Sequence, residues 1–454
     1  MKKNKFLAMA LILAVGLLPL LSACAAPTPQ IIEVEKEVVV EKKVIETVVV
    51  EKVVEPPPAP VTVKYWVINN DPDEELANKY AADFMATHPN IKVEVSRMGE
   101  NAEETIAASL AAGTAPDIVQ IGPVFAVAYS RYGALVPLDS FHDFQEAMQA
   151  AHKPADLIQS YQLGGYNYLI PWRGSPILLF YNKALLEQAG VEPPKSWDDL
   201  VAVSKAIKEK TGAWALGTEG GGLQPEGWHR MFDYLELYYN TPNKGQFLNE
   251  QGTEAIFNNA DAVKTLQVFV DIHQAGAAPT SAVDEDLFSA GKAAMTFAGS
   301  WKYPVMADVG VLQPEDVGAV LIPTSDGTMP SYTYGDPRDL AIFSQSKHPD
   351  EAWEFIKFML EDESSLELMK VTGQLPVRDD LTSNATFKAY FDEHPELMIF
   401  AESIGYTVPM DMSEHIWEVL SFFSSAFQKA CLGDATAQEA LDEAAVQVND
   451  ILGR

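Results

Sequence analysis

The chain has 454 residues, of which 47% are hydrophobic and 21% are charged, and its formal net charge is −32. So strong an acidic excess argues against a nucleic-acid-binding protein, because such proteins neutralise phosphates with Lys and Arg. The hydrophobic content excludes a wholly disordered chain, two cysteines are too few for a disulfide scaffold, and a single long apolar run excludes a polytopic membrane protein.

The N-terminus predicts an export signal. Lysines near the start precede an almost wholly apolar run over residues 6–21, and small residues then lead to Cys24. Residues 21–24, Leu-Ser-Ala-Cys, resemble a bacterial lipobox, in which the cysteine becomes the lipidated first residue of the mature protein. We therefore expect a signal peptide at 1–23 and lipidation at Cys24, with an ordinary secretory signal as the alternative. The mature chain would keep 29 basic and 64 acidic residues, a net charge of −35, with Cys431 as its one free thiol.

Residues 24–60 differ in composition from everything that follows. A Val/Glu/Lys block at 31–55 contains the repeat Val-Val-Val-Glu-Lys at 38–42 and 48–52, and a proline-rich stretch follows it. Prolines at this density favour an extended, stiff backbone. We expect 24–60 to be a spacer between the membrane and a folded body, with self-association through the valine block as the alternative.

Residues 61–454 begin with alternating strand and helix patterns. Strand-like runs start at residues 61 and 91, and a third occupies 117–122. Between these runs, Asp71-Pro72 and the pair Asn101 and Glu104 predict helix caps. This order of elements predicts an α/β fold with a largely parallel sheet.

The loops that follow two of these strands are candidate walls of a binding site. Asn69 and Asn70 follow the first predicted strand, and Gly122-Pro123 follows the third. The carboxyl ends of parallel strands form one edge of a sheet, and ligands of such folds bind beyond that edge. Closer to the C-terminus, amphipathic helices are expected around Trp417 and over 435–451.

Four later segments carry recognisable motifs. The first, at 178–200, contains Leu-Leu-Phe-Tyr-Asn-Lys and ends in Pro-Pro-Lys-Ser-Trp-Asp-Asp-Leu, and the others lie at 288–301, 349–359 and 373–378. In this order and at this spacing they resemble the family 1 extracellular solute-binding proteins, the group that contains maltose-binding protein. The resemblance extends over essentially all of 61–454.

The resemblance implies a type II periplasmic-binding-protein fold, in which two α/β lobes joined by a hinge enclose a ligand cleft. By analogy, lobe one would comprise 61–171 and 297–337, and lobe two 172–296 and 338–454. The resemblance also implies a receptor that captures a carbohydrate, most often an oligosaccharide, for the permease subunits of an ABC importer and needs no cofactor or metal. With the lipid anchor, this predicts a monomer held outside the cytoplasm, at the cell surface or in the periplasm.

A sugar site needs flat aromatic rings for the C–H faces of the sugar and hydrogen-bonding groups for its hydroxyls. The aromatic candidates are Trp301, Trp228, Trp172 and Trp417. The polar candidates are Asn69, Asn70, Asp117, Arg173 and Arg338, with Arg378 as a weaker one.

Each candidate has a structural alternative. The tryptophans can lie in the core, as is expected for Trp197 and Trp353. Asp117 can be a structural residue of a common family motif, and Arg338 can form a surface ion pair with a neighbouring aspartate.

Sequence motifs of catalysis point away from an enzyme. The chain contains no HExxH, CxxC or Walker-type glycine loop, and its eight histidines are scattered without ligand-like pairs. We therefore expect a binding protein. Three alternatives stay open: a secreted glycoside hydrolase using two of the 64 acidic residues, a binding protein for a non-sugar solute such as a phosphorylated polyol, and a structural surface protein projected by the spacer.

Overall fold

The computed structural model describes residues 60–453, apart from 100–101, 218–222, 224–226, 243, 282, 284, 329, 409 and 412. The expected signal peptide at 1–23, Cys24 and nearly all of the 24–60 spacer lie outside the described residues, as does Asn101 of the expected helix cap. No helix in the described part of the chain is both long enough and apolar enough to cross a membrane.

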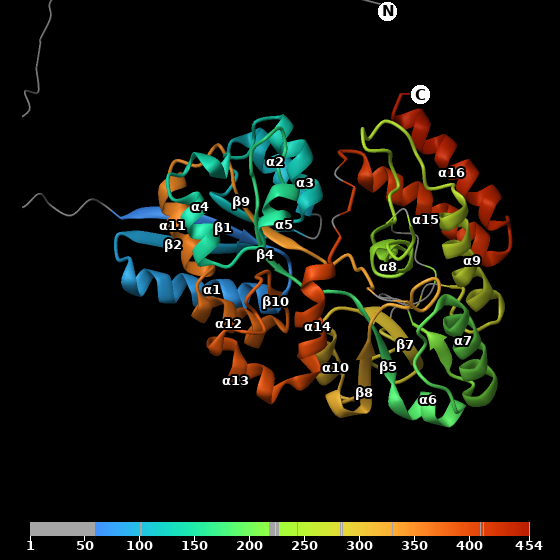
Figure 1. The fold of residues 1–454 in the computed structure, drawn as a ribbon. Coiled ribbons are helices and arrows are strands. Elements are labelled where there is room, and N and C mark those ends of the chain that lie inside the picture. Colours follow the sequence, from blue (N-terminus) through green and yellow to red (C-terminus); the bar gives the residue numbers. More distant parts are fainter. Residues whose placement is uncertain are drawn as a thin grey trace, which may run out of the picture. The chain divides into compact units, whose positions relative to one another are not determined.

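The first sheet has six strands in the order β10-β4-β9-β3-β1-β2 (Figure 1). Their bounds are β1 Val61–Val67, β2 Ile91–Arg97, β3 Ile118–Ile121, β4 Ile170–Gly174, β9 Arg338–Ile342 and β10 Leu375–Pro376. As predicted, β1 pairs in parallel with β2 and β3. The expectation of a largely parallel sheet is wrong, because β9 runs antiparallel to both β3 and β4, and β10 runs antiparallel to β4. Because β9 is reversed, its first residue, Arg338, lies at the edge where β3 ends.

Helices of this first lobe follow the strands in chain order. They are α1 Asp71–Thr87, α2 Ala102–Ala112, α3 Pro123–Arg131, α4 Phe144–Ala150, α5 Ala155–Ser160, α11 Pro349–Met359 and α12 Asp362–Thr372. The helix α1 begins where Asn70 Oδ1 accepts the Asp73 N–H at 2.8 Å, and proline stands in its first turn. Its side chains at helical spacing are buried against the sheet, and Trp353 of α11 packs in the same core, as expected.

The second sheet has four strands in the order β6-β7-β5-β8. The strands are β5 Leu178–Asn182, β6 Trp214–Leu216, β7 Ala293–Ala298 and β8 Val317–Val320. The helices of this second lobe are α6 Lys183–Ala189, α7 Trp197–Thr211, α8 Tyr234–Tyr238, α9 Ala260–Gln274, α10 Lys302–Val309, α14 Met398–Ser403, α15 Ile416–Leu432 and α16 Ala437–Ile451. The helix α13 Ala385–Glu393 contacts α12 of the first lobe, where the Tyr390 hydroxyl donates to Met369 O. A capping box of Ser196 and Asp199 starts α7, and Trp197 is buried, as expected.

Strand pairing corrects the expected lobe boundaries. The segment 297–337 was assigned to lobe one, yet β8 within it pairs with β5 of the second sheet. The segment 338–454 was assigned to lobe two, yet β9 and β10 belong to the first sheet, as does β4, which includes residues 172–174. The assignment failed because strand partners far apart in sequence leave no local signal in either strand.

Three connecting segments between the sheets meet at Thr333, which is buried. Its hydroxyl oxygen accepts the Ile177 N–H at 2.7 Å, its own N–H donates to Tyr406 O at 3.2 Å, and its carbonyl accepts the Val408 N–H at 2.8 Å. The buried Glu236 carboxylate of α8 accepts the N–H of the next residue, Tyr334, at 3.2 Å. The crossing segments are therefore bonded to one another and to the second lobe.

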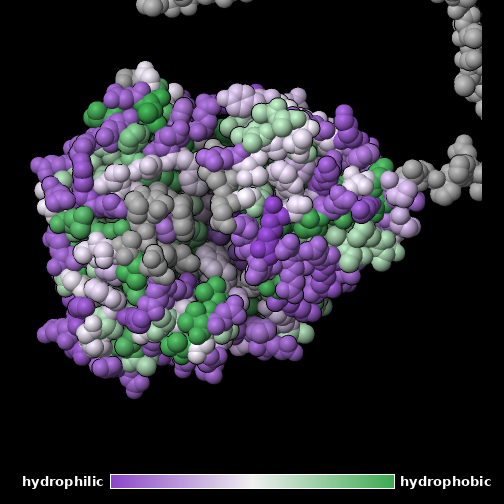
Figure 2. Space-filling view, turned by 180° about the vertical axis from the view of Figure 1, so that it is seen from behind, coloured by the Kyte–Doolittle hydropathy of each residue, from purple (hydrophilic) through white to green (hydrophobic). Residues whose placement is uncertain are grey.

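Hydrophilic residues cover much of the face seen in Figure 2, and the hydrophobic residues there occur in small, separate groups. With 64 acidic and 32 basic residues, ion pairs can neutralise at most half of the carboxylates. Net charge of this size opposes self-association and attraction to anionic membrane surfaces.

A buried ion pair joins α1 to β4. Arg173 Nη2 donates to the Asp73 carboxylate, and Nη1 donates to the Gln374 side chain in the turn before β10. The Arg173 and Asp73 side chains are only 1% and 4% exposed. Removing one partner of such a pair leaves an unpaired charge in the core, which is costly.

We expect Arg173→Met to lower the free energy of unfolding by about 3–5 kcal/mol. Adding Asp73→Leu should recover most of that loss, because the double variant buries no unpaired charge. Urea unfolding followed by circular dichroism measures both. A double variant as unstable as the single one would contradict this account of the pair.

The half-buried carboxylate of Asp411 makes stability depend on pH. Asp411 Oδ2 accepts the N–H groups of Phe247 and Leu248 at 2.6 and 3.0 Å, which holds the segment before α15 on the second lobe. Burial raises the pKa of Asp411 to about 6, against the lowering effect of the two N–H groups. An acid with a raised pKa keeps its proton longer in the folded chain than in the unfolded one, so stability falls as pH rises from 4 to 6.

Asp411→Asn keeps an oxygen acceptor for both N–H groups and carries no charge. We expect it to abolish a stability loss on the order of 2–3 kcal/mol between pH 4 and 6. Urea unfolding across this pH range, with the exposed Asp83→Asn as the charge-matched control, measures the difference. If the free energy of unfolding fell by the same amount between pH 4 and 6 in the wild type and in Asp411→Asn, the Asp411 carboxylate would not be the cause of that loss.

Candidate functional site

Several candidate residues meet at the edge of the six-stranded sheet where β1 and β3 end. Asn69 and Asn70 follow β1, and Gly122-Pro123 starts α3 directly after β3. The two loops lie close together, because the Ile68 N–H donates to the Gln120 side chain of β3 at 3.3 Å. Asn69 is exposed and Asn70 is half-buried with its side-chain oxygen capping α1. The expected walls of the site thus form one edge.

Arg338 stands at the same edge as the first residue of β9. Its Nη1 donates to Asp336 Oδ1 at 2.8 Å and to Pro337 O at 3.1 Å. The Arg338 side chain is 29% exposed, whereas that of Asp336 is 6% exposed. The alternative of an ion pair with a neighbouring aspartate is therefore correct, and the arginine still keeps one face toward solvent.

Trp301 comes from the second lobe, in the turn between β7 and α10. It is half-buried, and its ring meets Phe232 edge-on at 5.8 Å between ring centroids. Phe232 in turn lies 6.3 Å from Tyr334, which is two residues before Asp336. We call Trp301, Phe232 and Tyr334 the aromatic cluster. Tyr334 connects the aromatic cluster along the chain to the Asp336–Arg338 pair. Phe232 and Tyr334 are buried, so Trp301 is the ring of the cluster that is open to a ligand.

A second aromatic contact bridges the lobes. The Trp417 ring at the start of α15 lies 5.7 Å from Phe125 in the first turn of α3. Nearby, Arg131 Nη1 donates to Glu414 Oε1 at 2.5 Å. Trp417 is half-buried, and its Nε1 has no hydrogen-bond partner among the described residues. These contacts tie α3 to the start of α15 and bring Trp417 beside the candidate edge.

Three candidates are corrected by their surroundings. Trp172 is 2% exposed and packs in the core of the first lobe, and the guanidinium of Arg173 is committed to Asp73 and Gln374. Asp117 lies at the opposite end of β3, where its carboxylate accepts the Lys64 N–H and the Ser346 hydroxyl. We therefore withdraw Trp172, Arg173 and Asp117 as ligand contacts.

The remaining candidates fall outside the site or outside the described side chains. Arg378 is buried and bonds Asp362 and Asp380. Trp228 belongs to the short 3-10 helix Gly227–Met231, and its side chain is not among those described. Sequence reasoning missed Phe125, Phe232 and Tyr334, and it foresaw Asp336 only as an alternative ion-pair partner of Arg338. Only Phe125 carried a signal, since it follows the Gly122-Pro123 loop that was already singled out.

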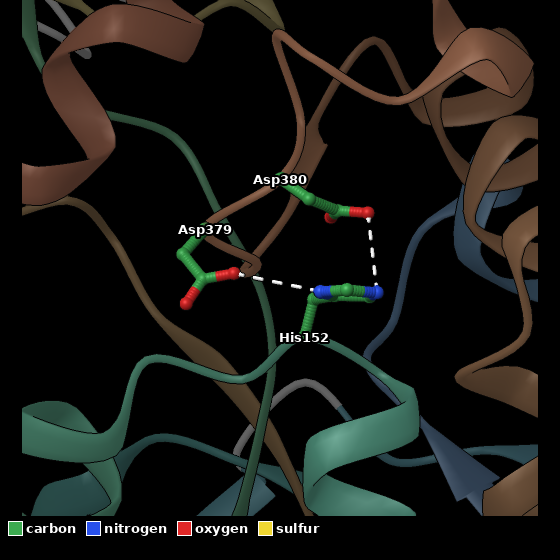
Figure 3. Close-up of side chains that lie close together, drawn as sticks. All are labelled: His152, Asp379 and Asp380. Atoms are coloured by element: carbon green, nitrogen blue, oxygen red, sulfur yellow. Dashed lines mark ion pairs between the residues drawn. The ribbon is translucent and has the colours of Figure 1, made fainter.

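Among the described residues, one group of side chains is close enough to hold a metal ion: His152, Asp379 and Asp380 (Figure 3). His152 Nδ1 lies 3.8 Å from Asp379 Oδ1, and Nε2 lies 3.7 Å from Asp380 Oδ2. The two carboxylates thus face different ring nitrogens, whereas an ion binds a histidine through one of them. Arg378 and Asn384 already bond both oxygens of Asp380. The group fits an exposed ion-pair cluster better than a metal centre.

Comparison with known proteins gives relatives of one kind. The chain is 24% identical over 337 residues to the diacetylchitobiose-binding protein DasA of Streptomyces coelicolor, covering 71% of this chain and 75% of the relative. It is 22% identical over 419 residues to the sn-glycerol-3-phosphate-binding periplasmic protein UgpB of Escherichia coli, covering 87% and 93%.

Solved structures and a family model agree with these relatives. The cyclic alpha-maltosyl-1,6-maltose-binding protein of Arthrobacter globiformis superposes with a TM-score of 0.74 at 22% identity, over 87% of this chain and 99% of that one. The fold is therefore that of the two-lobed periplasmic sugar-binding proteins. The sequence model of the bacterial extracellular solute-binding proteins matches residues 70–365, well over half of the chain. The chain belongs to the bacterial extracellular solute-binding protein family.

Proposed function

We propose that this protein is an extracytoplasmic receptor that binds a carbohydrate, in particular an oligosaccharide, between its two lobes and delivers it to an ABC importer. Binding would close the lobes by a hinge movement, as in periplasmic binding proteins. The protein itself would carry out no reaction, in keeping with a family of binding proteins.

The observation that carries the proposal is the aromatic cluster beside the Asp336–Arg338 pair. A sugar ring offers a C–H face that packs on an aromatic ring and hydroxyls that bond to charged and polar groups. Trp301 would supply the ring surface, since it is half-buried and its edge contact with Phe232 fixes its orientation. Arg338 and the asparagines Asn69 and Asn70 would bond the hydroxyls, and Trp417 would supply a second ring.

The relatives support an oligosaccharide. DasA is a diacetylchitobiose-binding protein and the Arthrobacter protein binds a cyclic maltosyl-maltose, so both take sugars of more than one ring. UgpB favours a second candidate ligand, a phosphorylated polyol such as sn-glycerol 3-phosphate. A phosphate of that kind is bound most strongly by charged donors such as an arginine that has no acidic partner.

We further propose that the chain is exported as a monomeric lipoprotein. The lipobox-like residues 21–24 support lipidation at Cys24, and the 24–60 spacer would hold the folded body away from the membrane. The permease subunits of the importer would then receive the closed, loaded body. The lipid keeps the receptor near them despite its acidic surface.

A panel of neutral di- and trisaccharides together with glycerol 3-phosphate tests the ligand class. We expect at least one neutral oligosaccharide to raise the melting temperature by an amount that grows with its concentration, because it binds only the folded chain. Chromatography of the same mixtures should show the sugar unchanged, whereas a glycoside hydrolase would release product.

For the sugar that binds, we expect Trp301→Ala to weaken affinity by about tenfold or more, which is about 1.4 kcal/mol. Trp214→Ala is the matched control, since Trp214 lies on β6 under Lys208 and outside the candidate site. Calorimetric titration measures both variants. Equal affinities for Trp301→Ala and the wild type would remove Trp301 from the site.

Lipidation has its own test. Expressed in a bacterium and labelled with a radioactive fatty acid, the wild-type chain should incorporate label and sediment with membranes. Cys24→Ser should do neither, because no thiol remains at the lipobox. Membrane-bound, labelled Cys24→Ser would contradict the assignment.

A further inference from the structure

Asp336 occupies a conformation that an aspartate adopts only at a cost. Its φ is +35°, in the left-handed region that favours glycine, and the residue is 4% exposed. The turn is held in place from outside, since the Ser175 N–H donates to Gly335 O at 2.8 Å. Glycine would relieve the strain, and asparagine would adopt this backbone as readily as aspartate does. The backbone conformation gives no reason for a carboxylate at this position, so we attribute the presence of aspartate to its negative charge.

The charge of Asp336 matters because two arginines lie side by side here. Arg173 of β4 and Arg338 of β9 are register partners on neighbouring antiparallel strands. Two adjacent guanidinium groups without partners would attract a carboxylate or a phosphate. In this chain each arginine has its own aspartate, Asp73 for Arg173 and Asp336 for Arg338.

The next charged neighbours keep the same balance. Asp339 and Lys153 are both buried and have opposite formal charges. At this edge the three basic residues Arg173, Arg338 and Lys153 thus stand against the three acidic residues Asp73, Asp336 and Asp339, and the buried Glu236, which accepts the Tyr334 N–H, adds no positive charge. Among the described residues, only Nη1 of the Arg338 guanidinium has hydrogen-bond partners, and the side chain is 29% exposed. The other N–H groups of the Arg338 guanidinium can therefore donate hydrogen bonds to a ligand.

We propose that Asp336 makes this receptor selective for uncharged carbohydrates. This inference rests on the proposed function. Arg338, whose charge is balanced by Asp336, donates hydrogen bonds to sugar hydroxyls. Asp336 excludes acidic sugars and phosphorylated solutes. A hydroxyl needs only the N–H donors of Arg338. A carboxylate or phosphate bonded to the same donors would lie near the Asp336 carboxylate, and the repulsion between them would cancel the attraction of the arginine.

Asp336→Asn tests the selectivity, because asparagine has the same shape and tolerates the left-handed backbone. The probes are maltose, cellobiose and diacetylchitobiose, each compared with the aldonic acid made by oxidising its reducing end, together with digalacturonic acid and glycerol 3-phosphate. Calorimetric titration at low and moderate salt gives each affinity. Thermal unfolding of every variant checks that it is folded.

We expect the wild type to bind at least one neutral disaccharide, and each acidic probe at least tenfold more weakly. Asp336→Asn should shift the ratio of acidic to neutral affinity at least tenfold toward the acid, with a gain that shrinks as salt rises. Arg338→Gln should weaken the neutral sugar and should not gain acidic binding. Asp83→Asn, an equal change of net charge at an exposed position on α1, should leave the ratio at its wild-type value.

The outcomes separate the two proposals. If a neutral disaccharide binds but Asp336→Asn leaves the ratio within about twofold of the wild type, the selectivity role of Asp336 is wrong and the carbohydrate receptor stands. The same holds if the wild type binds an acidic probe as tightly as its neutral partner. If no carbohydrate, neutral or acidic, binds any variant, the proposed function fails, and the inference that rests on it fails too.

Discussion

The hydrogen bonds of Thr333 are the constraint on which the geometry of the site depends. Through its hydroxyl, its N–H and its carbonyl, this one buried residue joins the segments that contain Ile177, Tyr406 and Val408. These are the segments through which the chain passes between the sheets. Because Thr333 directly precedes Tyr334, the same bonds fix where the turn to Arg338 begins. A hinge built in this way allows rotation between lobes while the crossing segments stay in register with one another.

The candidate site takes one kind of chemistry from each lobe. The carboxyl-end edge of the six-stranded sheet supplies polar groups, because strand ends and helix starts leave side chains such as Asn69 and Arg338 at the surface. The second lobe supplies rings, through Trp301 and Phe232. The crossing segment that carries Tyr334 and Asp336 connects the two, so that movement of the lobes would bring rings and donors together around a solute.

The sequence predicted the elements with strong local signals. The first strand was predicted from a few neighbouring residues and is present, and the start of α1 was predicted to within one residue, with the cap at Asn70 in place of the expected Asp71. Lobe boundaries were predicted wrongly because the partners of β8 and β9 are set by contacts across more than a hundred residues, which no local pattern encodes.

The site residues were also hard to predict, because contacts between distant parts of the chain leave no local pattern in the sequence. Trp172 and Trp301 look alike in sequence, since both are tryptophans beside a strand, yet one lies in the core and the other is half-buried at the surface. Phe232 and Tyr334 were missed because their role depends on meeting Trp301 in space. Arg338 was predicted as a candidate, with an ion pair to a neighbouring aspartate as the alternative, and the geometry of the turn identifies that aspartate as Asp336.

The crystal structure of the complex with the neutral oligosaccharide that binds most tightly tests this account most directly. We expect a sugar ring stacked on the Trp301 indole at about 4 Å, with a hydroxyl within about 3 Å of Arg338 and Asp336 still paired with the arginine. A sugar bound elsewhere, or bound between the lobes without contact to Trp301 or Arg338, would contradict it.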